Sequence, residues 1–485
     1  MSTQLTLQNI LALSPIIVTS FTAVFVMLAI AIKRNHFWNA TVAVLGLNIA
    51  LLSLWWVSQN VGMQHVTELF VVDRYACFYM AVILVASLAC LTMSHAYMEK
   101  HSGNREEMYL LLVLSTVGAL VLACSCHMAS FFIGMEILSV PLFGLAAYSF
   151  QRSRSLEAGI KYLVLSATST AFLLFGMALL YAQTGSLSFA GVQASLAGLP
   201  VMPQLAWAGC ALLFVALAFK LSFVPFHLWT PDVYEGAPAP VTAFLATVSK
   251  TAVLVAFLRL LHSMPVMNSG PMHDLMLVIA GLSIIVGNWL ALTQSNVKRL
   301  LGYSSIAHFG YLMIAVVAGT RMRDPAIAIY LVTYVITSLA AFGVLVLASS
   351  PYQGADADGL HNFRGLFWKR PYLAAVMTVA MLSLAGIPMT AGFIGKFHLV
   401  VVGVTSSFWW LLAALVVGSA MGLYYYLRVM VTLFLLEPGV RRFDAPLNWG
   451  RTTGGAMLLL MAVLMLLVGI YPQPLMQVVV AATMM

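Results

Sequence analysis

Six charged side chains that the loops do not account for stand inside long apolar runs of this 485-residue chain. They are Glu136, Lys161, Lys220, Lys250, Lys396 and Arg428. A charged side chain at the centre of a lipid bilayer costs at least ~2.5–3.5 kcal/mol, and such residues usually mark a path for ions or protons. Burial disfavours the charged form of a lysine, whereas a nearby carboxylate favours it. Moving Glu136 towards or away from Lys220 would change whether Lys220 holds a proton, so the set predicts a proton relay.

These charges also allow structural interpretations. Lys161 lies four residues after Glu157 near an expected helix start, so it can form an i,i+4 ion pair or extend to the membrane surface. Glu136 and Lys220 can form a buried structural pair, for which desolvation offsets the Coulomb gain. Lys250 lies in the middle of the stretch AFLATVSKTAVLVAF, far from either surface. A functional role is therefore favoured most for Lys250.

Other polar residues give weaker signals. His227 and His308 flank the expected membrane and His398 follows Lys396, although a single histidine near a helix end is more often structural. We include His227 beside Lys161 as a weaker candidate for proton transfer. Arg428 follows three tyrosines near a helix end, where its guanidinium is expected to extend to the membrane surface.

Cofactor motifs are missing from the sequence. There is no Walker A segment, no Gly-x-Gly-x-x-Gly motif after a strand and no cysteine spacing for an iron–sulfur cluster. Cys124, Cys126 and His127 lie close together, but helical side chains two residues apart point to different faces, so no metal site is expected. We therefore expect no cofactor in this chain, and any driving reaction must occur on a partner.

The composition defines the elements that must hold these residues. The chain is 62% apolar and only 8% charged, with 23 Lys or Arg and 15 Asp or Glu, and its mean hydropathy is +0.97. Soluble proteins carry roughly 25% charged residues. A soluble enzyme, a disordered chain and a nucleic-acid binder are therefore excluded. The net charge of +8 is typical of a membrane protein with Lys and Arg in the loops on one side.

Fourteen apolar runs are long enough to cross a bilayer as helices, which takes roughly 20 residues each. They are 10–32, 38–58, 75–97, 108–125, 128–149, 159–182, 205–226, 238–262, 275–295, 301–320, 326–349, 372–402, 407–434 and 454–473. The runs lack the alternation that a membrane barrel needs, so we expect an all-α polytopic membrane protein without strands. The first run is too long for a signal sequence and follows no Lys or Arg, so we expect it to be retained.

The basic loop residues separate between the two sides of the predicted membrane. One set of alternate loops carries Lys33, Arg34, Lys100, Arg105, Arg152, Arg154, Lys298, Arg299, Arg364, Lys369, Arg370, Arg441, Arg442 and Arg451. The other set carries Arg74, Arg259, Arg321 and Arg323. The positive-inside rule places the larger set in the cytoplasm and both termini outside it, with an even number of spans.

Two expected helices combine a lysine with residues that break a helix. Pro225 follows Lys220 by five residues and cannot donate to the carbonyl of Leu221. In LAGIPMTAGFIGK, three glycines and Pro388 weaken the helix before Lys396. Broken membrane helices recur at transporter sites, and an offset of five spans reverses topology, so spans 4–8 and 9–13 are expected to be inverted repeats. The expected single membrane domain, 1–485, comprises N-terminal helices in 1–100, a first repeat in 108–262, a second repeat in 275–434 and a last helix in 454–473.

Three long segments resemble a known family. They are PFHLWTPDVYEGAPAPV from Pro225, KRLLGYSSIAH from Lys298 and LSLAGIPMTAGFIGKF from Leu382. These segments, and essentially the whole chain, resemble the antiporter-like membrane subunits of respiratory NADH:quinone oxidoreductase, complex I. Members of that family have inverted repeats with broken seventh and twelfth helices. One branch of the family carries a long C-terminal lateral helix, whereas this chain ends soon after the last span. Two other branches carry a glutamate in span 12 where this chain has Lys396, so the resemblance favours a further branch.

The resemblance implies a role for each candidate residue. Glu136 in span 5 and Lys220 in span 7 would be a coupled pair. Lys250 in span 8 would be the central relay lysine, and Lys396 in span 12 would lie toward the exit. Lys161 in span 6 would match a family lysine with a weaker role.

The resemblance also implies partners and a location. Other subunits would oxidise NADH and reduce quinone, using FMN and iron–sulfur clusters, while this chain couples that electron transfer to proton pumping. The chain would lie in the bacterial cytoplasmic membrane, beside another antiporter-like subunit and in contact with lipid. The alternatives are a subunit of a multisubunit cation/proton antiporter, a structural spacer, and a transporter that acts alone.

Overall fold

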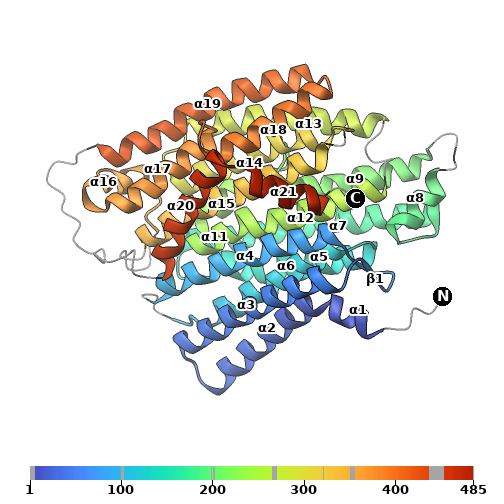
Figure 1. Cartoon of the computed structure of the whole chain (residues 1–485), viewed down its shortest axis with the longest axis horizontal. Coiled ribbons are helices and arrows are strands. Elements are labelled where there is room, and N and C mark those ends of the chain that lie inside the picture. The colour runs from blue at the N-terminus through green and yellow to red at the C-terminus, as the bar shows by residue number, and fades with distance from the viewer. Residues whose placement is uncertain are drawn as a thin grey trace.

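The computed structural model describes residues 6–99, 103–197, 199, 202–264, 270–320, 322–349, 356–435 and 453–483. Most of these residues lie in helices that pack side by side in one bundle (Figure 1). The α-helices are α1 (Leu7–Ala12), α2 (Ser14–Ile32), α3 (His36–Asn60), α4 (Arg74–Met98), α5 (Glu107–Cys124), α6 (Met128–Ala146), α7 (Ser153–Thr184), α8 (Phe189–Ala197), α9 (Gln204–Leu221), α10 (Trp229–Gly236), α11 (Ala239–Phe244), α12 (Lys250–Ser263), α13 (Gly270–Leu292), α14 (Val297–Val316), α15 (Arg323–Ser349), α16 (Leu366–Lys369), α17 (Pro371–Ala385), α18 (Ala391–Thr405), α19 (Trp409–Phe434), α20 (Thr453–Ile470) and α21 (Gln473–Thr483). The other elements are the π-helix η1 (Leu245–Ser249), the 3₁₀-helix η3 (Leu360–Phe363) and the strands β1 (Gln64–Val66) and β2 (Phe70–Val72).

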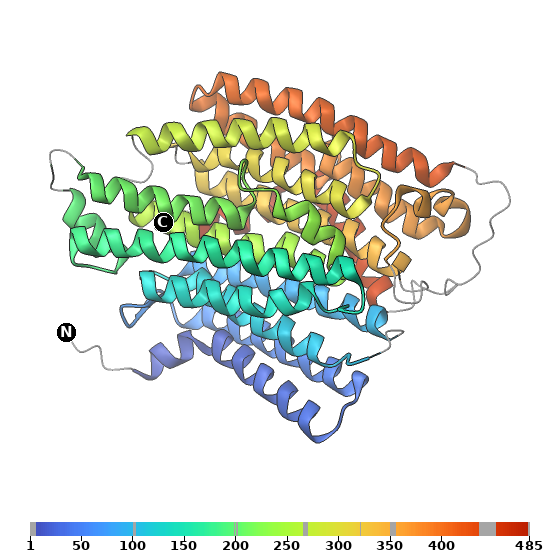
Figure 2. The ribbon, with the colours of Figure 1, turned by 180° about the vertical axis from the view of Figure 1, so that it is seen from behind.

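The bundle has a buried centre and apolar outer helices of the kind that face lipid. Helices α2 and α3 form one edge and α19 the other in both views (Figures 1 and 2). The run from α11 to α12 is 100% buried over its most apolar part, whereas the same measure is 28% for α2 and for α20. Large apolar side chains such as Phe21 and Trp55 are exposed on the outer helices, as expected where the solvent is lipid. The burial therefore places Lys250, the first residue of α12, at the centre of the bundle.

The predicted apolar runs match the observed helices. In the described part of the chain, 12 helices are long and apolar enough to cross a membrane, judged by length and composition. The two remaining predicted runs correspond to α14 and to the pair α17 and α18. The all-α multi-pass membrane fold is thus confirmed, and the count of fourteen spans stays a prediction.

Both predicted breaks occur in the structure. Helix α9 ends at Leu221, and α10 begins eight residues later. Trp229 Nε1 donates to the Phe219 carbonyl at 2.9 Å, and Thr230 Oγ1 donates to Ser222 Oγ at 2.6 Å, so α10 is hydrogen-bonded back across the break. The Phe219 carbonyl also accepts from the Ser222 backbone N–H at 3.0 Å, so the end of α9 is both capped and bonded to α10.

The second break relies on a glycine. Gly386 ends α17 with φ +83°, a conformation that costs a residue with a side chain roughly 1–2 kcal/mol. An added Cβ at Gly386 would lie 2.7 Å from Cδ of Lys396 on α18. The glycine therefore permits both the turn and the position of the lysine.

Several sequence-based expectations are corrected by the structure. The π-helix η1 directly before Lys250, the hairpin of β1 and β2, and the helix α10, which lies where a loop was expected, were not predicted. Arg259 was counted as a loop charge, but it lies inside α12, is 8% exposed and forms an ion pair at 2.9 Å with Asp73 before α4. Lys298, also counted with the loops, lies in the first turn of α14 and is 1% exposed. The predicted loop charges Lys100, Arg321, Arg441, Arg442 and Arg451 lie outside the described residues.

Candidate proton-transfer site

Lys220 lies in the last turn of α9 and is 6% exposed. Its Nζ donates to Ser139 Oγ on α6 at 2.6 Å and to Ser166 Oγ on α7 at 2.8 Å. A buried charge is costly unless its hydrogen-bonding capacity is met. Three helices therefore combine to hold this ammonium group, and its direct partners are hydroxyl groups.

Glu136 lies one turn before Ser139 on α6 and is half-buried. Its Oε1 accepts a hydrogen bond of 2.9 Å from Thr170 Oγ1, which lies one turn after Ser166 on α7. Among the described residues, Glu136 and Lys220 form no ion pair with each other. The direct pair that the sequence allowed is therefore absent from this arrangement. On α7, Ser166, which binds Lys220, and Thr170, which binds Glu136, lie one turn apart.

Lys250 is 1% exposed and follows the π-helix η1. Its Nζ donates to Ser305 Oγ on α14 at 2.7 Å, and the same oxygen accepts a bond of 2.8 Å from the Tyr334 hydroxyl on α15. The ammonium also lies 4.9 Å from the ring centroid of Phe309, within the range of a cation–π contact. Like Lys220, this central lysine bonds to a serine hydroxyl, and it also contacts an aromatic face.

A polar face of α14 continues from Lys250. Its members, spaced to fall on one side of the helix, are Ser304, Ser305, His308 and Tyr311. His308 Nδ1 lies 2.6 Å from the Tyr330 hydroxyl, and Nε2 lies 3.1 Å from the Tyr426 hydroxyl. Ser304 is hydrogen-bonded to the same Tyr426 hydroxyl. Each of these groups can both donate and accept, as proton transfer along a chain of hydrogen bonds requires.

Lys396 on α18 lies at the other end of this polar face and is 9% exposed. Its Nζ donates to the Ala385 carbonyl at 2.8 Å and lies 3.4 Å from Ser419 Oγ. The ammonium is 5.2 Å from the ring centroid of Tyr311, whose hydroxyl accepts a bond of 2.8 Å from Asn288 Nδ2. The α14 face therefore lies between the surroundings of Lys250 and those of Lys396.

The weaker candidates have different surroundings. His227 is buried between α9 and α10 and is 6% exposed. His398 Nδ1 lies 2.8 Å from the Ile394 carbonyl of its own helix, as expected for a structural role. Arg428 is partly buried and donates to the carbonyl of Leu292, the last residue of α13, at 2.9 Å. Arg428 thus caps a neighbouring helix.

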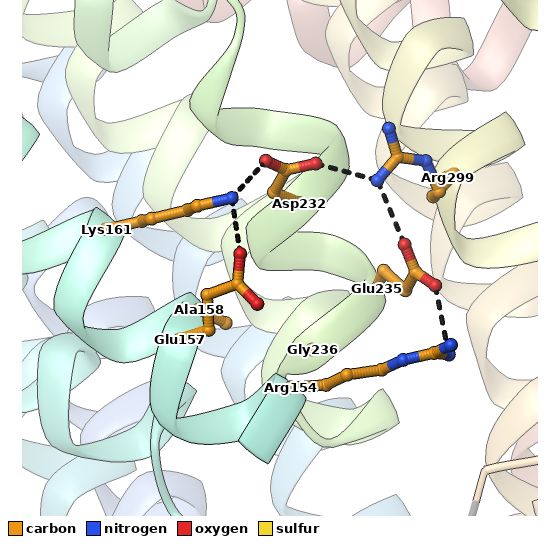
Figure 3. A pocket seen from close by; sticks show the side chains of 8 residues that line it. All are labelled: Arg154, Glu157, Ala158, Lys161, Asp232, Glu235, Gly236 and Arg299. Carbon is orange, nitrogen blue, oxygen red and sulfur yellow. Dashed lines mark hydrogen bonds and ion pairs between the residues drawn. The ribbon is translucent and has the colours of Figure 1, made fainter.

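Lys161 belongs to a separate cluster of charges. Its Nζ lies 2.6 Å from Glu157 Oε1, which confirms the i,i+4 ion pair, and 2.8 Å from Asp232 Oδ2 on α10. The cluster surrounds a cavity of about 240 Å³ (Figure 3). Its charged members are Arg154, Glu157, Lys161, Asp232, Glu235 and Arg299.

Sequence reasoning missed most of this charge cluster and the polar face of α14. Arg154 and Arg299 were assigned to loops, although Arg299 Nη1 binds Asp232 at 2.7 Å and Glu235 at 2.9 Å. The available signal was the spacing of Asp232 and Glu235, which places both carboxylates on one side of a helix. For α14, the signal was small polar residues at helical spacing in an apolar run.

The two neighbouring cysteines before α6 have different partners. Cys124 Sγ contacts Met80 Sδ at 3.6 Å, and Cys126 Sγ contacts the Glu68 carbonyl at 3.4 Å. Burial raises the pKa of the Cys126 thiol, which disfavours the thiolate that binds metals. Within the described ranges, no group of three His, Cys, Asp or Glu residues could hold a metal ion.

The fold is that of a class of membrane proteins defined by similarity in sequence and structure. Residues 125–422 match the family model described as NADH:quinone oxidoreductase/Mrp antiporter, transmembrane. The chain is also 57% identical, over 98% of its length and 97% of the relative's, to NADH-quinone oxidoreductase subunit N of Ectopseudomonas mendocina. The chain therefore belongs to the subunit N family of NADH-quinone oxidoreductase.

Solved structures show the same fold. A chain of respiratory complex I from Thermus thermophilus, solved with bound aureothin, is 32% identical with a TM-score of 0.81, and the match covers 96% of this chain and 98% of that one. Chains of an archaeal membrane-bound sulfane sulfur reductase and of the Mrp complex from a Dietzia species have TM-scores of 0.86 and 0.83 at 23% and 21% identity. Each of these last two matches covers 98% of this chain and 97% of the other.

Proposed function

We propose that this chain is a proton-translocating membrane subunit of a complex I, in which Glu136, Lys220, Lys250 and Lys396 form the relay. The observation that carries the proposal is the burial of the three lysines together with their partners. Each is at most 9% exposed, and each ammonium bonds to hydroxyl or carbonyl oxygens. Family membership, at 57% identity to a subunit N, supports the same function.

The partners of these lysines suit transfer of a proton better than permanent binding of a charge. Among the described residues, none of the three ammonium groups forms an ion pair with a carboxylate. A buried charge that is stabilised only by dipoles is costly, so each lysine can release its proton to a suitable acceptor. Glu136 and Lys220 would begin the relay, Lys250 and the α14 face would continue it, and Lys396 would deliver the proton toward the exit. Lys161 and His227 remain weaker candidates.

The finer assignments follow from the family and from the loop charges. The chain would assemble with other membrane and peripheral subunits, among them a neighbouring antiporter-like subunit. The FMN, the iron–sulfur clusters and the NADH and quinone sites would lie mainly on other subunits of the complex, with NADH oxidised in the peripheral arm. The larger basic set would face the bacterial cytoplasm and both termini would lie outside it. The breaks after α9 and α17 support inverted repeats in 108–262 and 275–434.

A substitution at the central lysine tests the proposed function. Lys250→Met removes the titratable group but keeps an unbranched apolar side chain of similar length. In purified complex I reconstituted into vesicles, we expect NADH-driven proton translocation to fall at least about tenfold at equal subunit content. Lys33→Met, which changes an exposed lysine at the end of α2, is the control and should leave translocation unchanged.

Two outcomes separate the alternatives. Normal translocation by the Lys250→Met complex would contradict the proposal and favour a structural spacer. Sodium-dependent proton transport without NADH oxidation would favour a cation/proton antiporter subunit.

A further inference from the structure

Asp232 on α10, the short helix after the first break, binds cations on two neighbouring helices, α7 and α14. Asp232 Oδ2 accepts from Lys161 Nζ on α7 at 2.8 Å, and Asp232 Oδ1 accepts from Arg299 Nη1 on α14 at 2.7 Å. Figure 3 shows the carboxylate between the two cations. Asp232 therefore joins a helix of the expected first repeat to a helix of the expected second repeat.

On the α7 side, this contact leads directly to the site of Lys220. Tyr162, the residue after Lys161, stacks on Trp229 of α10 with ring centroids 4.9 Å apart and an angle of 15°. Ser166, which binds Lys220, lies five residues after Lys161 on the same helix, roughly 7.5 Å along its axis. A shift of α7 relative to α10 would therefore move a direct partner of Lys220.

On the α14 side, the contact leads to the site of Lys250. Ser305, the partner of Lys250, lies six residues after Arg299, roughly 9 Å along α14. The neighbouring Lys298 donates to the Ala237 carbonyl at the end of α10 and to Asp356 Oδ2, each at 2.6 Å. Two consecutive basic residues of α14 thus hold α10, one through its carboxylates and one through its last carbonyl.

The other two carboxylates of the cluster, Glu157 and Glu235, connect the helices less closely than Asp232 does. Glu157 pairs with Lys161 of its own helix and is 59% exposed, so it joins no two helices. Glu235 also binds Arg299, but its contact to α7 is with Arg154, whose side chain is 75% exposed, at 3.2 Å. Exposed ion pairs contribute little. Asp232 has the shorter contacts to both neighbouring helices, and its partner on α7, Lys161, is 40% exposed, less than Arg154.

We propose that Asp232 is a positioning residue for proton transfer between Lys220 and Lys250: it fixes α7 and α14 against α10, and with them the hydroxyl groups that bind the two lysines. The inference rests on the proposed function. It assigns to Asp232 no proton of its own, because its contacts reach the lysines only through Ser166 and Ser305.

The substitution Asp232→Asn is a sharp test because it leaves both cations paired. Lys161 retains Glu157, and Arg299 retains Glu235. The amide has the shape of the carboxylate, so no unpaired buried charge is created and the complex should assemble. In vesicles, we expect the initial rate of proton translocation per NADH oxidised to fall at least about twofold.

The matched control is Glu157→Gln. It removes the other partner of Lys161 from the same cavity but leaves the connection between α7 and α10. Proton translocation per NADH should stay normal. Asp232→Glu keeps a charge that can reach both cations, so proton translocation per NADH in this variant should be close to normal. If Asp232 served only local stability, its substitution would lower the thermal stability of the complex without changing proton translocation per NADH.

The outcomes distinguish this inference from the proposed function when Lys250→Met is measured in the same preparations. Normal translocation by Asp232→Asn, with loss in Lys250→Met, overturns the positioning role and leaves the proposed function standing. Normal translocation by Lys250→Met overturns the proposed function itself. If the Asp232→Asn complex does not assemble, Arg299→Lys keeps the charge but shortens the side chain and weakens its contact with Asp232. A normal ratio in that variant likewise overturns the positioning role.

Discussion

Lys220 and Lys396 both lie beside a break in a helix, but only Lys396 bonds to a backbone carbonyl at its break. Lys220 precedes its break and binds two serine hydroxyls from neighbouring helices. The nearby Phe219 carbonyl is occupied by Trp229 Nε1. Lys396 follows its break and binds the Ala385 carbonyl, at the end of the helix before it. The backbone holds one lysine and side chains hold the other, so different substitutions should disable them.

The largest loss of proton translocation is expected from a substitution beside Lys396, the lysine that bonds to a backbone carbonyl. Gly386→Ala adds a Cβ that would lie 2.7 Å from Lys396 Cδ, at a φ of +83°. We expect proton translocation in reconstituted complex to fall at least about tenfold, because small displacements of a reacting group cost that much or more. The matched control is Gly62→Ala, at a φ of +60° with no atom within 4 Å of the added Cβ. Equal losses in both variants would contradict a specific role for the second break.

A smaller loss of proton translocation is expected at Lys220, which is bound by serine side chains. The double substitution Ser139→Ala and Ser166→Ala removes both hydroxyl partners of Lys220. An unsatisfied buried donor costs about 1–3 kcal/mol, so we expect translocation to fall about fivefold. Thr168→Ala is the control on α7, since this exposed hydroxyl bonds to the Val164 carbonyl of its own helix. Unchanged translocation in the double variant would show that the hydroxyl groups are dispensable.

The smallest effect is expected at the carboxylate. Thr170→Val removes the hydrogen bond to Glu136 without changing the shape of the side chain much. Glu136 is half-buried, and a hydrogen bond to a charged group contributes about 1.5–3 kcal/mol when fully buried, so a loss of about twofold in translocation is expected. A loss larger than that of the double serine variant would reverse the order proposed for the two partners of the pair.

The sequence was sufficient to predict those features whose physical cause lies within a few residues of the chain. Length and apolarity locate the helices, and Pro225 and Gly386 locate the breaks, because a missing donor and a left-handed turn act within a few residues. Lys250 could be placed at the centre because its apolar flanks extend far on both sides. Each of these expectations depends on neighbours in the chain.

The rest of the site depends on residues far apart in the chain. Asp232 and Arg299 are 67 residues apart, and Asp73 and Arg259 are 186 residues apart, so no periodicity could pair them. The hydroxyl partners of Glu136 and Lys220 lie on α6 and α7, whose facing positions follow only from helix packing. The sequence therefore located the charges and the local Glu157–Lys161 pair but not the partners that lie far away in the chain.

The proton relay is tested most directly by the number of protons translocated per NADH oxidised by complex I carrying Lys220→Ala. The complex is reconstituted into vesicles after its subunit content has been shown to be complete. We predict a greatly reduced ratio, because the relay would lack the lysine that links Glu136 to Lys250. A normal ratio in the fully assembled complex would contradict the account.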